Sequence, residues 1–349
     1  MTSGRVERSD PVALPEEFEP RRLRRRAALV SLVIAVILLV AALPPGLGDV
    51  RDRLGDARPG WLALAVALEA LSCLSFVLMF RPIFCPHMSK RTARELAFSE
   101  LGVGALVPAS GAAGLALGAW VLREGGMAGE QIARRSIAFF LIKSSVNFVA
   151  VAVVGTVAAL GFGPDLSPLL TVLPAAVSVA LIAAVVAMRK LGAGRPPRRE
   201  ASRPRRWFAA VQGALGGGIA EAIRLVRSRN PAILAGALGY WAFDNAVLWA
   251  TFNAFGESPE LVVVLLGYLI GQLGGLLPLP GGIGGIDGGL VGTLIVYGAP
   301  AGLTVAAVLG YRVILFWLPL VAGAVAFASL RRGLNRPDRP DLCDVPAAV

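Results

Sequence analysis

The fold depends on the stretch Leu276-Leu277-Pro278-Leu279-Pro280-Gly281-Gly282-Ile283-Gly284-Gly285-Ile286-Asp287-Gly288-Gly289, which interrupts a long apolar region. Proline and repeated glycine disfavour a continuous helix. In lipid, each backbone amide left unpaired by such a break costs several kcal/mol unless protein or trapped water satisfies it. The stretch therefore predicts a broken helix beside a cavity inside a membrane protein.

The composition excludes a soluble globule. Of 349 residues, 56% are hydrophobic and only 16% are charged, and the mean hydropathy is +0.68. The net charge of +11 comes from arginines that cluster between apolar runs, where positive charge fixes membrane orientation. We therefore expect an all-α polytopic helix bundle of about eight transmembrane segments in the cell (plasma or inner) membrane, with no nucleic-acid partner.

The chain divides into five predicted parts. They are a basic cytoplasmic N-terminal tail (1–26), a first membrane half with a break near 108–111 (27–188), a basic cytoplasmic loop with an interfacial helix (189–230), a second membrane half with a break near 278–289 (231–332) and a cytoplasmic C-terminal tail (333–349). The interfacial helix is expected over Trp207–Val226, although Gly216-Gly217-Gly218 weakens the case for a continuous one.

The first break predicts a re-entrant hairpin. Pro108 cuts the segment from Glu95 to Leu122 into pieces of about a dozen residues, roughly 18 Å each, against a hydrocarbon core of about 30 Å. If the segment crossed the membrane once, the loop 189–230 with its eleven Lys or Arg residues would lie outside. The positive-inside rule therefore favours the hairpin and places both termini in the cytoplasm.

The two breaks form an internal repeat. Pro108 and Pro278 are 170 residues apart, and the predicted helices around them run in opposite directions. The same offset matches four further pairs: Leu106 with Leu276, Gly111 with Gly281, Gly114 with Gly284, and Gly118 with Gly288. This pattern is typical of an inverted-topology repeat with a binding site near the bilayer midplane. Chance similarity between glycine-rich segments is the alternative, and two short full spans around Pro278 are the alternative to a second hairpin.

Six ionisable residues fall inside predicted membrane segments, where charges are costly and face a cavity or a partner: Glu69, Glu100, Lys143, Asp244, Asp287 and Arg312. Lys143 and Arg312 are expected near mid-depth. A new half-helix starts at Gly111, after the potential cap Ser110, and another near Gly282, and each presents free amides and a positive dipole end. Two cations and two helix starts would suit an anion such as a lipid phosphate.

The predicted headgroup-binding residues lie at the breaks or inside the membrane helices: Lys143, Arg312, Asp287, Ser110, Gly111, Gly281, Gly282, Gly284, Glu69, Asn147 and Asp244. Asn147 lies one helical turn beyond Lys143. The alternative is purely structural pairing, of Lys143 with Glu100 or Asp244 and of Arg312 with Asp287. No metalloprotease, nucleophile-elbow or Walker motif occurs, so we expect neither catalysis, nor a metal, nor a cofactor.

The breaks resemble those of the flippase-like transmembrane region of the lysylphosphatidylglycerol synthase family. The resemblance rests on Pro278-Leu279-Pro280-Gly281-Gly282-Ile283-Gly284 with Asp287 and Arg312 beyond it, and on Leu106-Val107-Pro108-Ala109-Ser110-Gly111 with Leu122-Arg123-Glu124-Gly125-Gly126. It covers roughly residues 27–332. Family members usually carry Glu where this chain has Asp287, so the charge is kept on a shorter side chain.

The resemblance implies translocation of a phospholipid or lipid-linked headgroup between leaflets. The two-part synthases append a soluble aminoacyl-transfer domain, and about seventeen residues after Arg332 are too few for one. We therefore expect a lipid flippase or transporter without lipid-aminoacylating activity. The alternative is a non-transporting partner or scaffold of a separate lipid-modifying enzyme, and a homo-oligomer also stays open.

Overall fold

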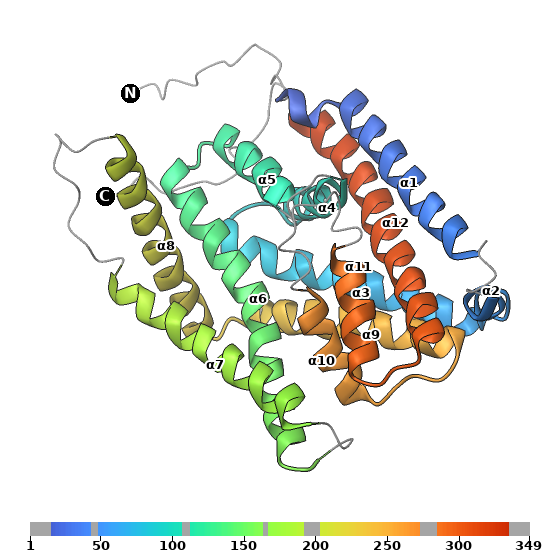
Figure 1. Cartoon of the computed structure of the whole chain (residues 1–349). Helices are drawn as coiled ribbons and strands as arrows, with labels where there is room; N and C mark the ends of the chain where they lie inside the picture. Colours follow the sequence, from blue (N-terminus) through green and yellow to red (C-terminus); the bar gives the residue numbers. More distant parts are fainter. Residues whose placement is uncertain are drawn as a thin grey trace, which may run out of the picture.

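The computed structural model describes residues 15–42, 48–106, 112–162, 167–191, 203–272 and 285–334, and these ranges are helical without any strand (Figure 1). After a short 3-10 turn at Glu16–Phe18, the helices are α1 (Pro20–Ala42), α2 (Gly48–Gly55), α3 (Pro59–Phe84), α4 (Lys90–Leu106), α5 (Ala112–Glu124), α6 (Gly129–Ala159), α7 (Pro168–Leu191), α8 (Arg203–Arg227), α9 (Pro231–Phe255), α10 (Leu261–Gln272), α11 (Gly285–Val296) and α12 (Ala301–Leu334). The predicted all-α bundle is confirmed. The tips of both breaks, 107–111 and 273–284, lie outside the described residues.

Four of the described helices are both long and apolar enough to cross a membrane. They are Pro59–Phe84, Gly129–Ala159, Pro168–Met188 and Ala301–Leu334. Large aliphatic side chains remain exposed on them, for example Leu173 and Val179 on α7 and Val325 on α12. A surface of this kind is stable only when lipid covers it, as a multi-pass membrane protein requires.

The order of helices repeats. A long helix, two short helices and another long helix occur first as α3-α4-α5-α6 and again as α9-α10-α11-α12. Helix α9 begins 172 residues after α3, α10 171 after α4, α11 173 after α5 and α12 172 after α6. The offset of 170 between the two prolines is therefore the offset of two whole four-helix units.

The packing of these units has the same symmetry. The short helices of each half pack against the last helix of the other half, α4 on α12 and α10 on α6, while α3 packs on α9. Figure 1 shows α6 and α12 on opposite sides of the central pair α3 and α9. Because every such contact has a counterpart in the other half, the two units are related by an approximate twofold rotation.

The central helices α3 and α9 are antiparallel. At one end the Arg58 amide donates to the Ala254 carbonyl at 2.9 Å, and further along the Ser72 hydroxyl donates to the Tyr240 carbonyl at 3.3 Å. Beyond this point Gly236 packs against Met79. Equivalent helices that run in opposite directions require a rotation axis perpendicular to them, so the predicted inverted repeat is confirmed.

Helices α10 and α11 form an antiparallel hairpin. Gly267 faces Leu294, while Gly271 faces Leu290 and the backbone of Gly289. Each helix has 12 described residues, about 18 Å at helical rise, which is less than the hydrocarbon core of about 30 Å. Helices α4 and α5 likewise pack together across a five-residue connection. Both halves therefore place a short helix pair between long helices.

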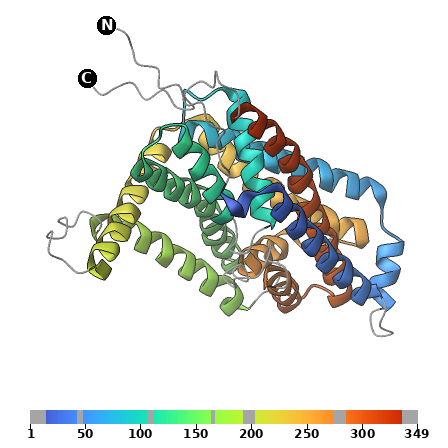
Figure 2. The same cartoon turned by 90° about the horizontal axis from the view of Figure 1, so that it is seen from above.

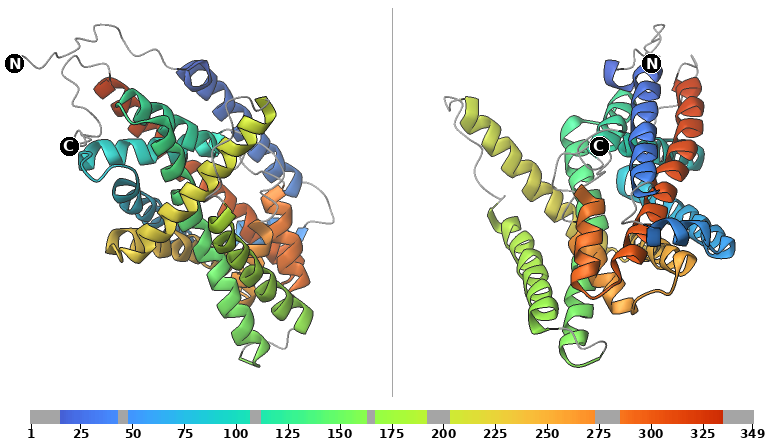
Figure 3. Two further views of the ribbon diagram at one scale, coloured as in Figure 1. Left: turned by 90° about the vertical axis from the view of Figure 1, so that its left-hand side faces the viewer. Right: turned by 45° about the vertical axis from the view of Figure 1, so that its right-hand side comes forward.

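Helix α8 continues through the glycine triplet that argued against it. Gly217 and Gly218 pack directly on Arg134 and Ile137 of α6, and a side chain at either position would collide with them. The triplet therefore serves close helix packing rather than a break. Together α7 and α8 lean against α6 at one side of the bundle, as Figures 2 and 3 show.

The contact between α4 and α12 predicts a sensitive glycine. A Cβ atom added to Gly102 would lie 2.9 Å from the Gly323 Cα atom, so Gly102→Ala forces two backbones apart. We expect it to lower the free energy of unfolding by about 1–3 kcal/mol in a thermal or denaturant titration in detergent. Gly292→Ala on α11, where nothing lies within 4 Å, is the matched control and should be neutral or stabilising. Equal effects of the two substitutions would contradict the packing argument.

The inverted repeat predicts the sides of four connections. Single cysteines at His87 and Ala128, in the first half, should react with an impermeant thiol reagent only from the cytoplasmic side. Cysteines at Glu257 and Pro300, in the second half, should react only from outside. All four positions are exposed, and the background replaces Cys73, Cys85 and Cys343 by serine. Labelling of His87→Cys and Ala128→Cys from opposite sides would show that the first break is a full span.

Candidate functional site

A polar cavity of about 290 Å³ lies where the two repeats meet. Each of the eight repeat helices contributes at least one residue to its wall. Examples, one from each helix, are Glu69 (α3), Glu100 (α4), Gly114 (α5), Lys143 (α6), Asp244 (α9), Gln272 (α10), Ile286 (α11) and Pro319 (α12). Phe76, Phe139 and Tyr240 add an aromatic surface. A cavity between inverted repeats is the usual position of a transport site.

Two buried glutamates face this cavity. Glu69 and Glu100 are each 4% exposed. The Cys73 thiol donates to Glu69 Oε1 at 3.4 Å, but neither Glu69 Oε2 nor Glu100 Oε2 has a hydrogen-bond partner within the described residues. Buried polar atoms without partners destabilise a fold, so these two oxygens are candidates for contact with a ligand or water in the cavity.

Glycines of α5 make room for Glu100. A Cβ atom on Gly118 would overlap the Glu100 carboxylate, and one on Gly114 would overlap the Glu100 backbone carbonyl. Helix α5 can therefore approach α4 with the carboxylate enclosed between them. Gly114 and Gly118 are two of the residues matched by the 170-residue offset. In the first half, their lack of a side chain leaves space for Glu100.

Lys143 brings a positive charge to the same cavity. Its Nζ atom lies 5.4 Å from the ring centroid of Tyr240 and 5.9 Å from that of Phe76, within cation–π range. Glu100 and Asp244 act on Lys143 electrostatically, but no carboxylate of the described residues lies within 4.0 Å of it. The structural ion pair considered for Lys143 is therefore not formed, and the ammonium group lies over the aromatic residues that line the cavity.

Asp244 is held by two tyrosines. The Tyr268 hydroxyl of α10 donates to Asp244 Oδ2, and the Tyr311 hydroxyl of α12 donates to Oδ1 at 3.0 Å. Because Ser72 of α3 meets Tyr240 of the antiparallel α9, Glu69 and Asp244, each about one turn away, lie at one level of the crossing, and both line the cavity. Asp244 therefore connects α9, α10 and α12 at the wall of the cavity.

Arg312 is paired, as the structural alternative proposed. Its Nε and Nη2 atoms lie 2.6 and 2.5 Å from Asp287 Oδ1, and both side chains are largely buried. Asp287 lies in the first turn of α11, where a carboxylate is also stabilised by the helix dipole. Arg312 acts electrostatically on Asp244 as well. The pair thus fixes the start of α11 against α12 beside the cavity.

The sequence-predicted residues separate into three groups. Glu69, Lys143 and Asp244 line one cavity, with the Arg312–Asp287 pair next to it. Asn147 does not line the cavity, and its buried Oδ1 atom has no hydrogen-bond partner in the described part of the chain. The remaining predicted residues lie outside the described ranges: Ser110, Gly111, Gly281, Gly282 and Gly284.

The predicted helix starts at Gly111 and Gly282 lie outside the described residues, but the first turns of α5 and α11, which follow them, are described. Gly114 in the first turn of α5 and Ile286 in the first turn of α11 line the same cavity. The first turns of two helices, one from each half, therefore meet at the same cavity.

Several site residues were not among the predicted ligands. The sequence indicates Glu100 as a membrane-embedded charge and as a possible ion-pair partner of Lys143, but not as a ligand, and Tyr240, Tyr268 and Tyr311 are not among the predicted residues. A signal was present, because three of the chain's four tyrosines lie within apolar segments rather than at their ends. A buried tyrosine hydroxyl needs a hydrogen-bond partner. Within an apolar segment the possible acceptors are a few carboxylates and backbone carbonyls, so a tyrosine there points to a nearby carboxylate.

Comparison with known proteins identifies the family. The model of the lysylphosphatidylglycerol synthase TM region matches residues 28–323, which contain every helix of the two repeats except the end of α12. This chain belongs to the lysylphosphatidylglycerol synthase TM region family. The resemblance inferred from the two breaks is thereby confirmed. The matched region includes both breaks and the whole cavity.

Two similar proteins align with most of this chain. A UPF0104 membrane protein of Methanothermobacter thermautotrophicus is 27% identical over 334 residues, 88% of this chain and 93% of the relative. A second protein of that name and organism is 23% identical over 324 residues, 87% of this chain and 95% of the relative. These names agree with a membrane protein and specify no activity.

The tyrosine pair predicts a measurable coupling. Tyr311→Phe leaves an oxygen of buried Asp244 without its donor, so we expect a loss of about 1–3 kcal/mol in the free energy of unfolding. In an Asp244→Asn background the same substitution should cost clearly less, giving a coupling energy of about 0.5–3 kcal/mol in a double-mutant cycle. Tyr297→Phe, whose hydroxyl donates to Leu170 outside the cavity, is the control and should show no coupling to Asp244. Additive effects at 244 and 311 would contradict the contact.

Proposed function

We propose that this chain is a lipid transporter of the flippase type, which moves a phospholipid or lipid-linked headgroup between leaflets through the cavity between its repeats. The observation that carries the proposal is the position of Lys143. A membrane-embedded lysine with no ion-pair partner among the described residues faces a cavity lined by both halves. Retaining such a charge in lipid is costly, and a phosphate that binds it would compensate for that cost.

The charged residues that line the cavity indicate which type of headgroup would fit it. Among the described residues that line the cavity are three carboxylates, of Glu69, Glu100 and Asp244, and one lysine, Lys143. A purely anionic headgroup would meet more negative than positive charge there. A headgroup with both a phosphate and an amine fits better, the phosphate at Lys143 and the ammonium group at the unpartnered oxygens of Glu69 and Glu100. The family's name refers to a lipid of this chemical type.

The inverted repeat supplies a route between leaflets. Because the two halves have similar structures in opposite orientations, a rocking movement that opens the cavity to one side has a counterpart that opens it to the other. The contacts α4 with α12 and α10 with α6 are the equivalent surfaces that such a movement would exchange. The Arg312–Asp287 pair would keep α11 on α12 during the movement.

The proposal predicts a specific loss of transport. Purified protein in vesicles should accelerate transbilayer movement of labelled phospholipids, with the largest effect for a lipid that carries an amine and a phosphate. Lys143→Gln should reduce this rate by about tenfold or more, since it removes a charge-assisted contact of roughly 1.5–3 kcal/mol. Lys143→Arg should recover part of the rate. Lys90→Gln, on the exposed start of α4, is the matched control and should leave transport unchanged.

A different set of results would favour the alternative function, that of a membrane partner or scaffold. If the wild-type protein moves no anionic, zwitterionic or aminoacylated lipid, transport is excluded for these substrates. A stable co-purifying lipid-modifying enzyme whose activity depends on this chain, with Lys143→Gln harmless, would then assign it the role of a membrane partner or scaffold.

A further inference from the structure

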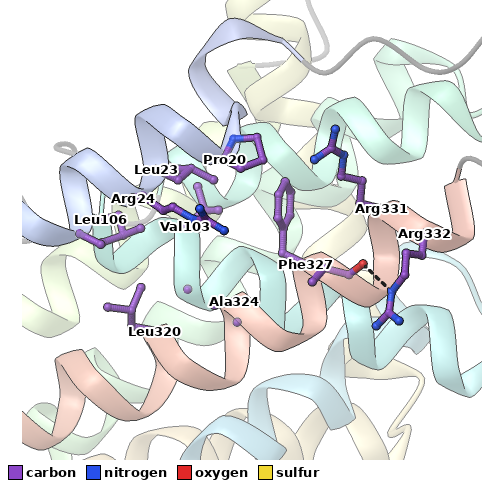
Figure 4. A pocket seen from close by; sticks show the side chains of 14 residues that line it. Pro20, Leu23, Arg24, Val103, Leu106, Leu320, Ala324, Phe327, Arg331 and Arg332 are labelled. Atoms are coloured by element: carbon purple, nitrogen blue, oxygen red, sulfur yellow. Dashed lines mark hydrogen bonds between the residues drawn. The ribbon is translucent and has the colours of Figure 1, made fainter.

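A second and larger hollow lies on the outside of the bundle. It measures about 590 Å³ and runs between α1, α4 and α12. Most of its wall is apolar, including Leu23, Val103, Leu106, Leu320 and Phe327 (Figure 4). This size lies in the range of ligand-binding pockets, and the lining suits hydrocarbon.

Three arginines line this groove, Arg24 of α1 and Arg331 and Arg332 of α12. Figure 4 shows Arg331 and Arg332 at one side of Phe327 and Arg24 at the other, next to Val103. Arg332 Nε donates to the Ala328 carbonyl at 3.3 Å, and none of the three arginines forms an ion pair within the described residues. The groove therefore joins an apolar channel to three guanidinium groups.

This groove is separate from the central cavity. On α4, Gly102, Val103 and Leu106 face the groove, whereas Leu101, Gly104 and Ala105 face the cavity. Between the two spaces α4 crosses α12 at Gly102 and Gly323, where the backbones are so close that no side chain fits. A molecule in the groove consequently does not contact Lys143 or the carboxylates of the cavity.

We propose that the groove binds one anionic phospholipid from the surrounding membrane, with an acyl chain along α4 and α12 and the phosphate at Arg24, Arg331 and Arg332. Charge complementarity selects this occupant, since basic pockets between transmembrane helices attract anionic headgroups and guanidinium groups bind phosphate in two-point contacts. None of the described residues that line the groove is a carboxylate, unlike those of the cavity. The inference concerns binding on the outer wall and does not depend on the proposed transport.

Native mass spectrometry of the full-length protein tests this proposal. The protein is released from bilayers of equal phosphatidylglycerol and phosphatidylcholine, and retained lipids are counted. We expect the wild type to retain one phosphatidylglycerol in preference to phosphatidylcholine. Each arginine lost should weaken retention roughly fivefold, so Arg24→Gln/Arg331→Gln/Arg332→Gln should abolish the preference. The control Arg21→Gln/Arg25→Gln/Arg227→Gln removes the same charge from exposed positions outside the groove and should keep it.

A steric variant tests the acyl-chain part. Ala324 is exposed in the groove, so Ala324→Trp fills it without disturbing the core, whereas Val325→Trp on the neighbouring face is the matched control. We expect only Ala324→Trp to lose the retained lipid while keeping the wild-type elution volume and helicity. The proposal is overturned if the wild type shows no preference for phosphatidylglycerol, if the groove variants match their controls, or if a second copy of the chain proves to fill the groove.

Discussion

The antiparallel packing of α3 against α9 is the contact on which the rest of the molecule depends. It is made by small residues, since Gly236 and Gly239 of α9 lie directly against Met79 and Ser75 of α3. In a membrane, where lipid is as apolar as a leucine side chain, close backbone approach of this kind supplies much of the attraction between helices. Once the two equivalent helices run in opposite directions, the other helices of the two halves follow in the same order and with opposite orientation.

This inversion explains why polar groups can gather in the centre of an apolar protein. The short helices α4, α5, α10 and α11 leave space between the long ones, and all eight helices direct residues into it. A charged side chain costs little free energy in water, but inside a membrane it is costly unless it is paired with another group or with a ligand. The molecule uses both solutions. Asp244 accepts hydrogen bonds from two tyrosines and Arg312 pairs with Asp287, whereas Lys143, Glu69 and Glu100 line the cavity without an ion-pair partner among the described residues.

Two chemically different sites result from the same four-helix unit and its neighbours. The central cavity mixes carboxylates with a lysine, which suits a headgroup of both charges. The outer groove combines an apolar wall with arginines, which suits an anionic lipid with its chain attached. The close crossing of Gly102 and Gly323 keeps them apart. A substitution at this crossing would therefore affect both sites through the position of α4.

The sequence by itself determined the all-α membrane class, the two breaks, the offset between them and the family. Hydrophobic run length and proline and glycine positions depend on local physics, so they can be read from one chain. It also drew attention to Lys143, Glu69 and Asp244, because any charge in an apolar run is conspicuous.

Only the tertiary structure decided which charges satisfy one another. Arg312 meets Asp287 rather than the cavity, and Asp244 meets Tyr268 and Tyr311, because residues tens of positions apart are brought together by helix packing. The role of Gly118, whose missing side chain makes room for Glu100, and the groove beside α1 likewise depend on how close neighbouring helices lie. Distances of a few ångströms between helices have no local signature in the sequence, and they decide which groups remain available to a ligand.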